Sequence, residues 1–201
     1  MALLLTLYLI KTMNIKQWLK ADYLPIPLIA LMVLTRFHHF GDVLHLPDAT
    51  LAVFFFAGFY RKKTLLGFLL VLAGLIDYVA IKNGVSGWCI SPAYVFLIPT
   101  FATMWLAGRY AATFKTMSVL EWLKSIGLLT LATSAAFVIS NGSFYLFSGR
   151  FEELSFVDYF ASVAQYYPSY VGAAMIYSII GLAIVKLLNL LFSVQISQKS
   201  V

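Results

Sequence analysis

Charged residues are scarce in this chain, and their scarcity excludes an ordinary soluble domain. Of the 201 residues only 11% are charged, whereas 62% are hydrophobic. Soluble domains typically carry about 25% charged residues. The hydrophobic residues lie in long blocks, which is the pattern of a polytopic helical membrane protein. The net charge of +6 does not indicate nucleic-acid binding, because the basic residues lie at the ends of apolar blocks rather than in one patch.

Cysteine and several catalytic motifs are also scarce or missing. The single cysteine, Cys89, excludes an intrachain disulfide, so the compartment cannot be inferred from disulfides. The chain has no glycine-rich phosphate loop, no G-x-S-x-G motif and no paired glycosidase carboxylates. We therefore expect no ATPase in the chain itself, and uphill transport would need a partner or an ion gradient.

Six apolar blocks follow an N-terminal segment. Residues 1–23 contain an apolar decamer followed by lysines and a tryptophan, which predicts a cytoplasmic interfacial helix or, alternatively, a poorly ordered terminus. No basic residue precedes the decamer, so we expect it to be retained rather than cleaved as a signal peptide. Because a spanning helix needs about 20 residues, the blocks predict a six-helix membrane domain over 24–195 and a tail over 196–201. The blocks are residues 24–40, 47–60, 63–81, 92–110, 118–140 and 168–194.

Some details of these helices can also be predicted. The block 47–60 is short, which indicates either a helix that crosses the bilayer at an unfavourable tilt or a helix that is partly re-entrant. Pro99 lies inside the fourth block and predicts a kink there. The aromatic-rich segment 141–167 predicts an outer loop that is either a lid over a pocket or an interfacial belt. Small residues at helical spacing predict close helix contacts. These pairs are Gly67 with Gly74, Ala107 with Ala111, and Ala132 with Ala136.

Basic residues are distributed unevenly between the two sets of predicted loops. The outer loops 41–47, 82–91 and 141–167 hold only Lys82 and Arg150 as basic residues. By the positive-inside rule, both termini are then cytoplasmic and Cys89 lies on the outer side. The basic residues expected inside are Lys11, Lys16, Lys20, Arg61, Lys62, Lys63, Arg109, Lys115 and Lys199.

Two residues near the outer ends of the helices could carry chemistry. Asp77 lies within the third block, and a charge inside a membrane segment indicates a functional site unless it is simply hydrated at the interface. Cys89 lies in a glycine-rich turn, where an exposed thiol would oxidise unless it had a role; the alternative is a small buried apolar residue. One cysteine is not a zinc site, but a thiolate could supply an axial ligand to a metal already held in a macrocycle.

Histidines cluster in the segment TRFHHFGDVLHLPD. His38, His39 and His45, together with Cys89 and Asp77, could form a transition-metal site. Their alternative role is hydrogen bonding at the membrane interface.

A resemblance to a known family is carried by the same region. The segments RFHHFG and LPDATLAVFFFAGFY, and above all the block from Asp77 to Tyr94, DYVAIKNGVSGWCISPAY, resemble BtuM proteins. These are cobalamin-specific substrate-binding (S) components of bacterial energy-coupling-factor (ECF) transporters. The resemblance covers the chain from about Arg36 to Arg109.

The resemblance implies an all-α, six-helix S-component-like bundle in the bacterial inner membrane that binds cobalamin from the outside. Cys89 matches the family cysteine that approaches cobalt as an axial ligand, in place of the dimethylbenzimidazole of the vitamin. Asp77 and Tyr94 match its partners in the pocket, and His39, beside His38, matches a family histidine. The thiolate could also promote loss of an upper axial ligand such as cyanide. Removal of that ligand (decyanation) is the enzymatic activity that the resemblance suggests.

The implied partners are cobalamin, the lipid bilayer, an ECF transmembrane coupling protein and ATPase subunits. One departure bears on the coupling protein. S components often carry an AxxxA docking motif on the first helix, whereas here Ala30 is followed by Leu34.

Two other functions are compatible with the sequence. The chain could be a membrane-embedded thiol enzyme that uses Cys89, although a redox relay usually needs a cysteine pair. It could also be a scaffold subunit of a membrane complex. A corrinoid chromophore in the purified protein would favour cobalamin uptake over both.

Overall fold

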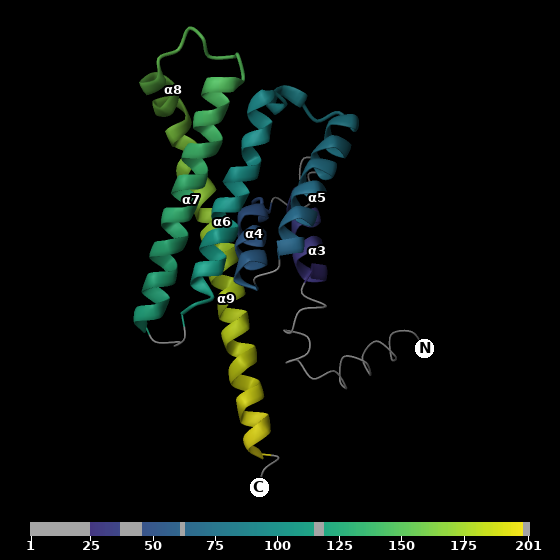
Figure 1. Ribbon diagram of the computed structural model, residues 1–201, viewed down its shortest axis with the longest axis vertical. Helices are drawn as coiled ribbons and strands as arrows, with labels where there is room; N and C mark the ends of the chain where they lie inside the picture. Colours follow the sequence, from purple (N-terminus) through teal and green to yellow (C-terminus); the bar gives the residue numbers. More distant parts are fainter. Residues whose placement is uncertain (1–24, 37–45, 61–62, 115–118, 199–201) are drawn as a thin grey trace.

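The computed structural model describes residues 25–36, 46–60, 63–114 and 119–198, and within these ranges the chain is helical with no strand. The expected all-α fold is therefore confirmed for this part of the chain (Figure 1). The α-helices are α3 (Pro25–Arg36), α4 (Thr50–Phe59), α5 (Lys63–Lys82), α6 (Leu97–Ala111), α7 (Val119–Phe147), α8 (Phe156–Val163) and α9 (Tyr167–Gln198). Three short 3₁₀ helices join them: η3 (Gly87–Cys89), η4 (Pro92–Phe96) and η5 (Ala164–Tyr166).

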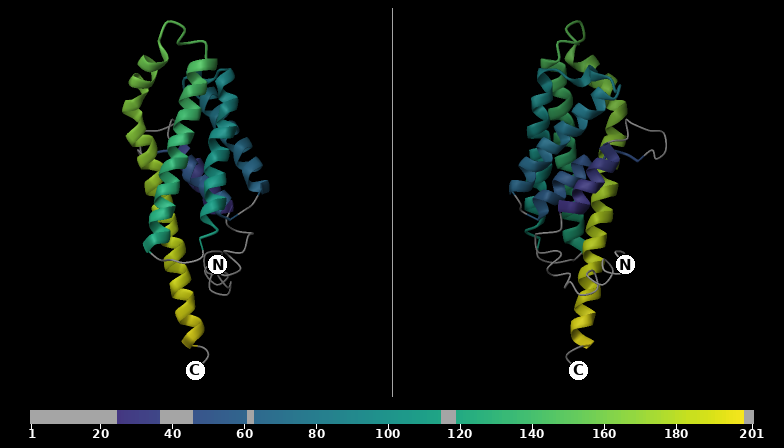
Figure 2. Two further views of the ribbon diagram at one scale, coloured as in Figure 1. Left: turned by 60° about the vertical axis from the view of Figure 1, so that its left-hand side comes forward. Right: turned by 90° about the vertical axis from the view of Figure 1, so that its right-hand side faces the viewer.

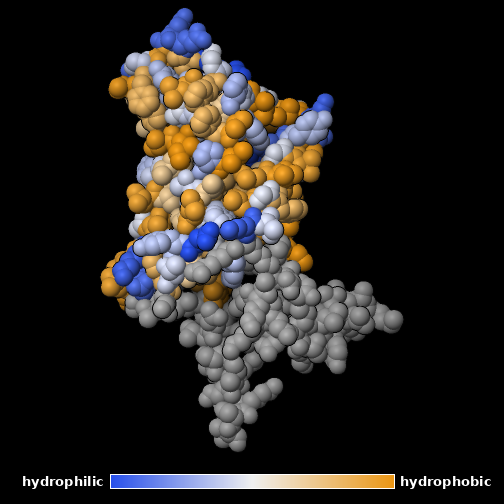
Figure 3. Space-filling view, viewed as in Figure 1, coloured by the Kyte–Doolittle hydropathy of each residue, from blue (hydrophilic) through white to orange (hydrophobic). Residues whose placement is uncertain are grey.

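Long apolar helices indicate a membrane protein. Three stretches of the described chain are long and apolar enough to cross a bilayer, namely Lys63–Lys82, Val119–Phe147 and Phe156–Val185. Their outward faces carry exposed hydrophobic side chains such as Val71 and Leu131. On the face shown in Figure 3, hydrophobic residues predominate between strongly hydrophilic residues at the upper end and a second hydrophilic group lower down. Helix α9 lies along the bundle and projects beyond the other helices at its C-terminal end (Figure 2).

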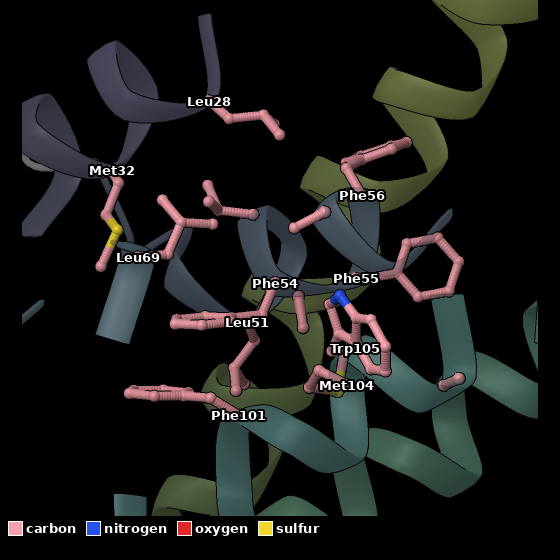
Figure 4. Close-up of a cluster of buried hydrophobic side chains, with 14 of the residues drawn as sticks. Leu28, Met32, Leu51, Phe54, Phe55, Phe56, Leu69, Phe101, Met104 and Trp105 are labelled. Atoms are coloured by element: carbon pink, nitrogen blue, oxygen red, sulfur yellow. The ribbon is translucent and has the colours of Figure 1, made fainter. Parts of the chain in front are cut away.

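Helix α4 is the centre of the hydrophobic core. Every residue from Thr50 to Gly58 is buried, because the helix is apolar on all its faces and packs against α3, α5, α6 and α9 (Figure 4). Its 10 residues span about 15 Å at 1.5 Å per residue, roughly half of a bilayer core. The short block expected to tilt or re-enter is thus a half-length helix enclosed by its neighbours.

Two glycines bring α4 and α6 into backbone contact. A Cβ atom on Gly58 would lie 1.9 Å from the carbonyl oxygen of Trp105. A Cβ atom on Gly108 would lie 1.9 Å from the carbonyl oxygen of Phe55. No side chain fits at either position, so the two helices pack without any intervening group.

The predicted small-residue contacts are correct on two helices and wrong on a third. The alanines of α6 and α7 are buried in the bundle, as the spacing predicted: Ala107, Ala111, Ala132 and Ala136. By contrast, a Cβ atom on Gly67 or Gly74 would meet nothing within 4 Å. That face of α5 therefore makes no helix contact with the described residues, because small size permits a close approach without requiring one.

Two predicted boundaries need correction. The fourth block is not one kinked helix: residues 92–96 form η4, and Pro99 lies in the first turn of α6, where its missing N–H group is not needed. The segment 141–167 is not an extended loop. Helix α7 continues to Phe147 and ends before Gly149, which has a φ angle of 67°, and α8 and η5 follow.

Candidate functional site

A cavity of about 660 Å³ lies at the end of the bundle where α5 ends and α7 meets α8. The last turns of α5 and α7 form two sides, η3 and η4 a third, and α8 with η5 a fourth. Below them lie Arg36, the last residue of α3, and Asp48, two residues before α4. The cavity therefore adjoins the N-terminal end of the buried helix α4.

Arg36 and Asp77 form a two-point ion pair in the cavity floor, which we define as Arg36, Asp48, Asp77 and Tyr94. The Nε atom of Arg36 donates to Oδ1 of Asp77 at 2.7 Å, and Nη2 donates to Oδ2 at 2.6 Å. The side chains are 12% and 22% exposed. A guanidinium matches a carboxylate in this paired geometry, which fixes the orientation of both groups. Charges within membrane helices usually pair in this way.

Tyr94 is the third member of the floor. Its hydroxyl donates a 2.6 Å hydrogen bond to Oδ2 of Asp77. The residue lies in η4, which begins at Pro92 after the extended residue Ser91. Proline at this first position fixes the backbone angle that starts the turn, so the local sequence turns Tyr94 back toward the end of α5.

Asp48 completes the floor from the α3–α4 connection. Its Oδ1 atom accepts a 2.9 Å hydrogen bond from the backbone N–H of Thr50 and a second, short one from the Thr50 hydroxyl. This carboxylate thereby satisfies the first backbone N–H of α4, two residues further on, as in an Asx turn. The Nη1 atom of Arg36 donates to Oδ2 of Asp48 at 3.3 Å and to the Thr50 hydroxyl at 3.2 Å. Arg36 therefore links the two carboxylates.

An aromatic wall faces the floor. Trp88 contacts Phe144 and Phe151 edge-on, with ring centroids 5.2 and 6.2 Å apart, and Phe151 in turn contacts Tyr159 at 4.7 Å. The guanidinium of Arg150 lies 4.8 Å from the Trp88 ring centroid, in cation–π contact. The aromatic residues of 141–167 thus lie against a cavity. The lid interpretation is compatible with this placement.

The wall depends on the cap that starts α8. The backbone N–H of Asp158 donates to the Ser155 hydroxyl at 3.2 Å, and that hydroxyl donates to the Asp158 carboxylate at 2.6 Å. This reciprocal cap begins a helix whose Tyr159 is almost fully buried.

The structure brings together some of the residues singled out from the sequence. Asp77 and Tyr94 both line the cavity and are hydrogen bonded to each other. Cys89 ends η3, and its neighbours Trp88 and Ile90 line the cavity. His38, His39 and His45 lie outside the described residues. Within the described ranges, no three His, Cys, Asp or Glu side chains lie close enough to hold a metal ion.

Sequence reasoning missed Arg36 and Asp48 as floor residues. Arg36 is a charge inside an apolar block, so the rule that singled out Asp77 applied to it equally. Asp48 precedes Thr50 by two residues, a spacing typical of an Asx turn. The chain matches no protein-family model and no curated protein. Its function is therefore argued from the chemistry of the cavity.

Proposed function

We propose that this protein is the membrane subunit that binds cobalamin for uptake, with the corrinoid in the cavity and Cys89 as an axial ligand of cobalt. One observation carries the proposal. The block from Asp77 to Tyr94, which carries the resemblance to BtuM proteins, contributes residues of α5, η3 and η4 to the cavity lining. The segment with the family-like sequence is thus also the segment that builds the site.

The size and character of the cavity support a large amphipathic ligand. Its volume of about 660 Å³ is within the range of about 300–1,000 Å³ that is usual for small-molecule sites. Apolar and aromatic side chains form most of its lining, and the charged side chains among the described lining residues lie in the floor. A corrin ring has apolar faces and a polar amide periphery. Trp88 and Tyr166 are at least half exposed at the margin, so part of the ligand can extend out of the cavity.

The role of Cys89 follows from the chemistry of cobalt in a corrin. Four ring nitrogens occupy the equatorial positions, so a protein can supply only axial ligands. A thiolate is the form of cysteine that binds metals, and ligation favours its deprotonation. Because Trp88 and Ile90 on either side line the cavity, the backbone of Cys89 lies along the cavity wall.

The proposal includes the topology and the energy source. The three long apolar stretches supply three of six proposed membrane helices, and the shorter helices α3, α4 and α6 supply the others. The cavity then opens outward, and both termini lie in the cytoplasm of a bacterium. Since the sequence has no phosphate-binding loop, ATP hydrolysis is assigned to partner subunits joined through a coupling protein.

Binding of aquacobalamin to the purified full chain tests this function. We expect wild-type protein to bind the vitamin with the absorbance change of a cobalt–thiolate bond. Cys89→Ser and Cys89→Ala should abolish that change. Ser91→Ala is the matched control, because it alters a residue two positions away that does not line the cavity. Absence of corrinoid binding, or an unchanged spectrum and affinity in Cys89→Ala, would refute the proposal.

A further inference from the structure

The two carboxylates of the cavity floor differ in how fully they are hydrogen bonded. Asp77 accepts three short bonds, two from Arg36 and one from Tyr94, all at 2.6–2.7 Å. An ionised carboxylate has about four acceptor positions, so most of its capacity is used within the protein. Its side chain is only 22% exposed. Asp77 is therefore committed to holding the floor together.

Asp48, by contrast, is more exposed and less fully hydrogen bonded than Asp77. Its side chain is 50% exposed and lines the cavity. The Oδ1 atom is occupied by Thr50, but from the described residues Oδ2 accepts only the 3.3 Å bond from Arg36. That distance exceeds the 2.7–2.9 Å typical of bonds between charged groups. Asp48 therefore keeps acceptor capacity that a ligand can use.

The charges of the described lining residues also do not cancel. Among the described residues that line the cavity, Arg36 is the basic side chain, and Asp48 and Asp77 are the acidic ones. One positive and two negative charges leave a formal charge of −1. The two shortest bonds of Arg36 go to Asp77, so the excess negative charge lies mainly at Asp48.

We infer that Asp48 is a specificity residue of the cavity, which accepts a hydrogen bond from a ligand amide and disfavours a ligand carboxylate at the same position. This inference rests on the proposed function, since cobalamin carries acetamide and propionamide groups around its ring. An amide supplies N–H donors to Oδ2 of Asp48. A carboxylate supplies only acceptors and brings a second negative charge against the first. The cavity thereby selects the fully amidated corrinoid over its partly hydrolysed acids.

A comparison of cobalamin with its monocarboxylic acids tests the inference. In each acid one propionamide is hydrolysed, and the isomers place the new carboxylate at different points of the ring. We expect wild-type protein in detergent to bind at least one isomer about tenfold or more weakly than cobalamin, since like charges in contact are strongly unfavourable. In Asp48→Asn this ratio should fall to within about threefold. Glu153→Gln is the control, because it removes the same charge from an exposed residue outside the cavity lining, and its ratio should stay at the wild-type value.

The outcomes separate this inference from the proposed function. If wild-type protein binds no corrinoid, the proposed function itself fails. If it binds cobalamin and all the acids equally, only the role of Asp48 is overturned. That comparison uses wild-type protein alone, so it holds even if Asp48→Asn does not fold. A wild-type ratio that persists unchanged in folded Asp48→Asn also overturns the assignment.

Discussion

The core around α4 and the cavity floor adjoin each other, yet they are stabilised by opposite means. In the core, apolar side chains pack against one another and, at Gly58 and Gly108, backbone packs directly on backbone. In the floor, Arg36 and Asp77 are held by directed charged bonds. The Arg36 guanidinium lies 5.8 Å from the ring centroid of Phe101, which stacks on Phe54 at 4.5 Å, so the two regions meet at these rings.

The core around α4 and the cavity floor should therefore tolerate different substitutions, the core being sensitive to volume and the floor to charge. At Gly58 and Gly108 the core has no room for an added carbon, so a side chain there must displace a backbone. The floor borders a cavity, so volume can change there, but an unpaired charge cannot be accommodated cheaply. Adding atoms should therefore be most harmful in the core, and removing one charge most harmful in the floor.

Gly108→Leu should have the largest effect. Its Cβ atom would overlap the carbonyl oxygen of Phe55, and a backbone atom cannot move aside as a flexible side chain can. We expect α4 and α6 to separate, so that the purified protein is not monodisperse in size-exclusion chromatography. Gly127→Leu on α7 is the control, because a Cβ atom there meets nothing within 4 Å. A folded Gly108→Leu protein with wild-type thermal stability would contradict the contact.

Arg36→Met should have the next largest effect. It leaves the Asp77 carboxylate, 22% exposed, without its cation, and breaking such a pair typically costs about 3 kcal/mol or more. Thermal or denaturant unfolding in detergent measures the loss. The double variant Arg36→Met/Asp77→Leu should be more stable than Arg36→Met alone, because the less exposed carboxylate is then removed with its cation and only the half-exposed Asp48 loses its partner. Equal stability of the single and double variants would show that the pair is not coupled.

Tyr94→Phe should have the smallest effect of the three. It removes one hydrogen bond to Asp77 but leaves the ring and both bonds from Arg36, so we expect a loss of about 1 kcal/mol. The same unfolding measurement applies. Tyr166→Phe at the exposed cavity margin is the control and should change stability by less than about 0.5 kcal/mol. A loss as large as that of Arg36→Met would mean that Tyr94 supports more than this bond.

The helical fold could be predicted from the sequence, and so could two of the four floor residues, Asp77 and Tyr94. The same reasons explain why Arg36 and Asp48 were not predicted. Long apolar blocks predict helices directly. Asp77 and Tyr94 lie only 17 residues apart in the chain, so the sequence itself brings them near each other. Arg36 is 41 residues from Asp77, and hydropathy carries no information about which distant charge a carboxylate meets. The contact of Gly108 with Phe55 could not be predicted either, because it depends on how two separate helices pack together.

The misread segment 141–167 illustrates a different limit. Its place between two apolar blocks predicted a loop, and its aromatic residues predicted a lid or an interfacial belt. Neither property distinguishes a loop from short helices with aromatic faces. The sequence SFVD at 155–158 carries a capping signal, and the structure uses it to start α8.

The length of α4 has a consequence for permeation. Helix α4 begins beside the cavity floor and runs away from it, and buried side chains of this helix and its neighbours fill the region along it. Within the described residues, packed side chains therefore separate the cavity from the opposite end of the bundle. A molecule could cross the described bundle from the cavity to its opposite end only if α4 and the surrounding helices changed their mutual packing. Such a change would move whole helices rather than a few side chains.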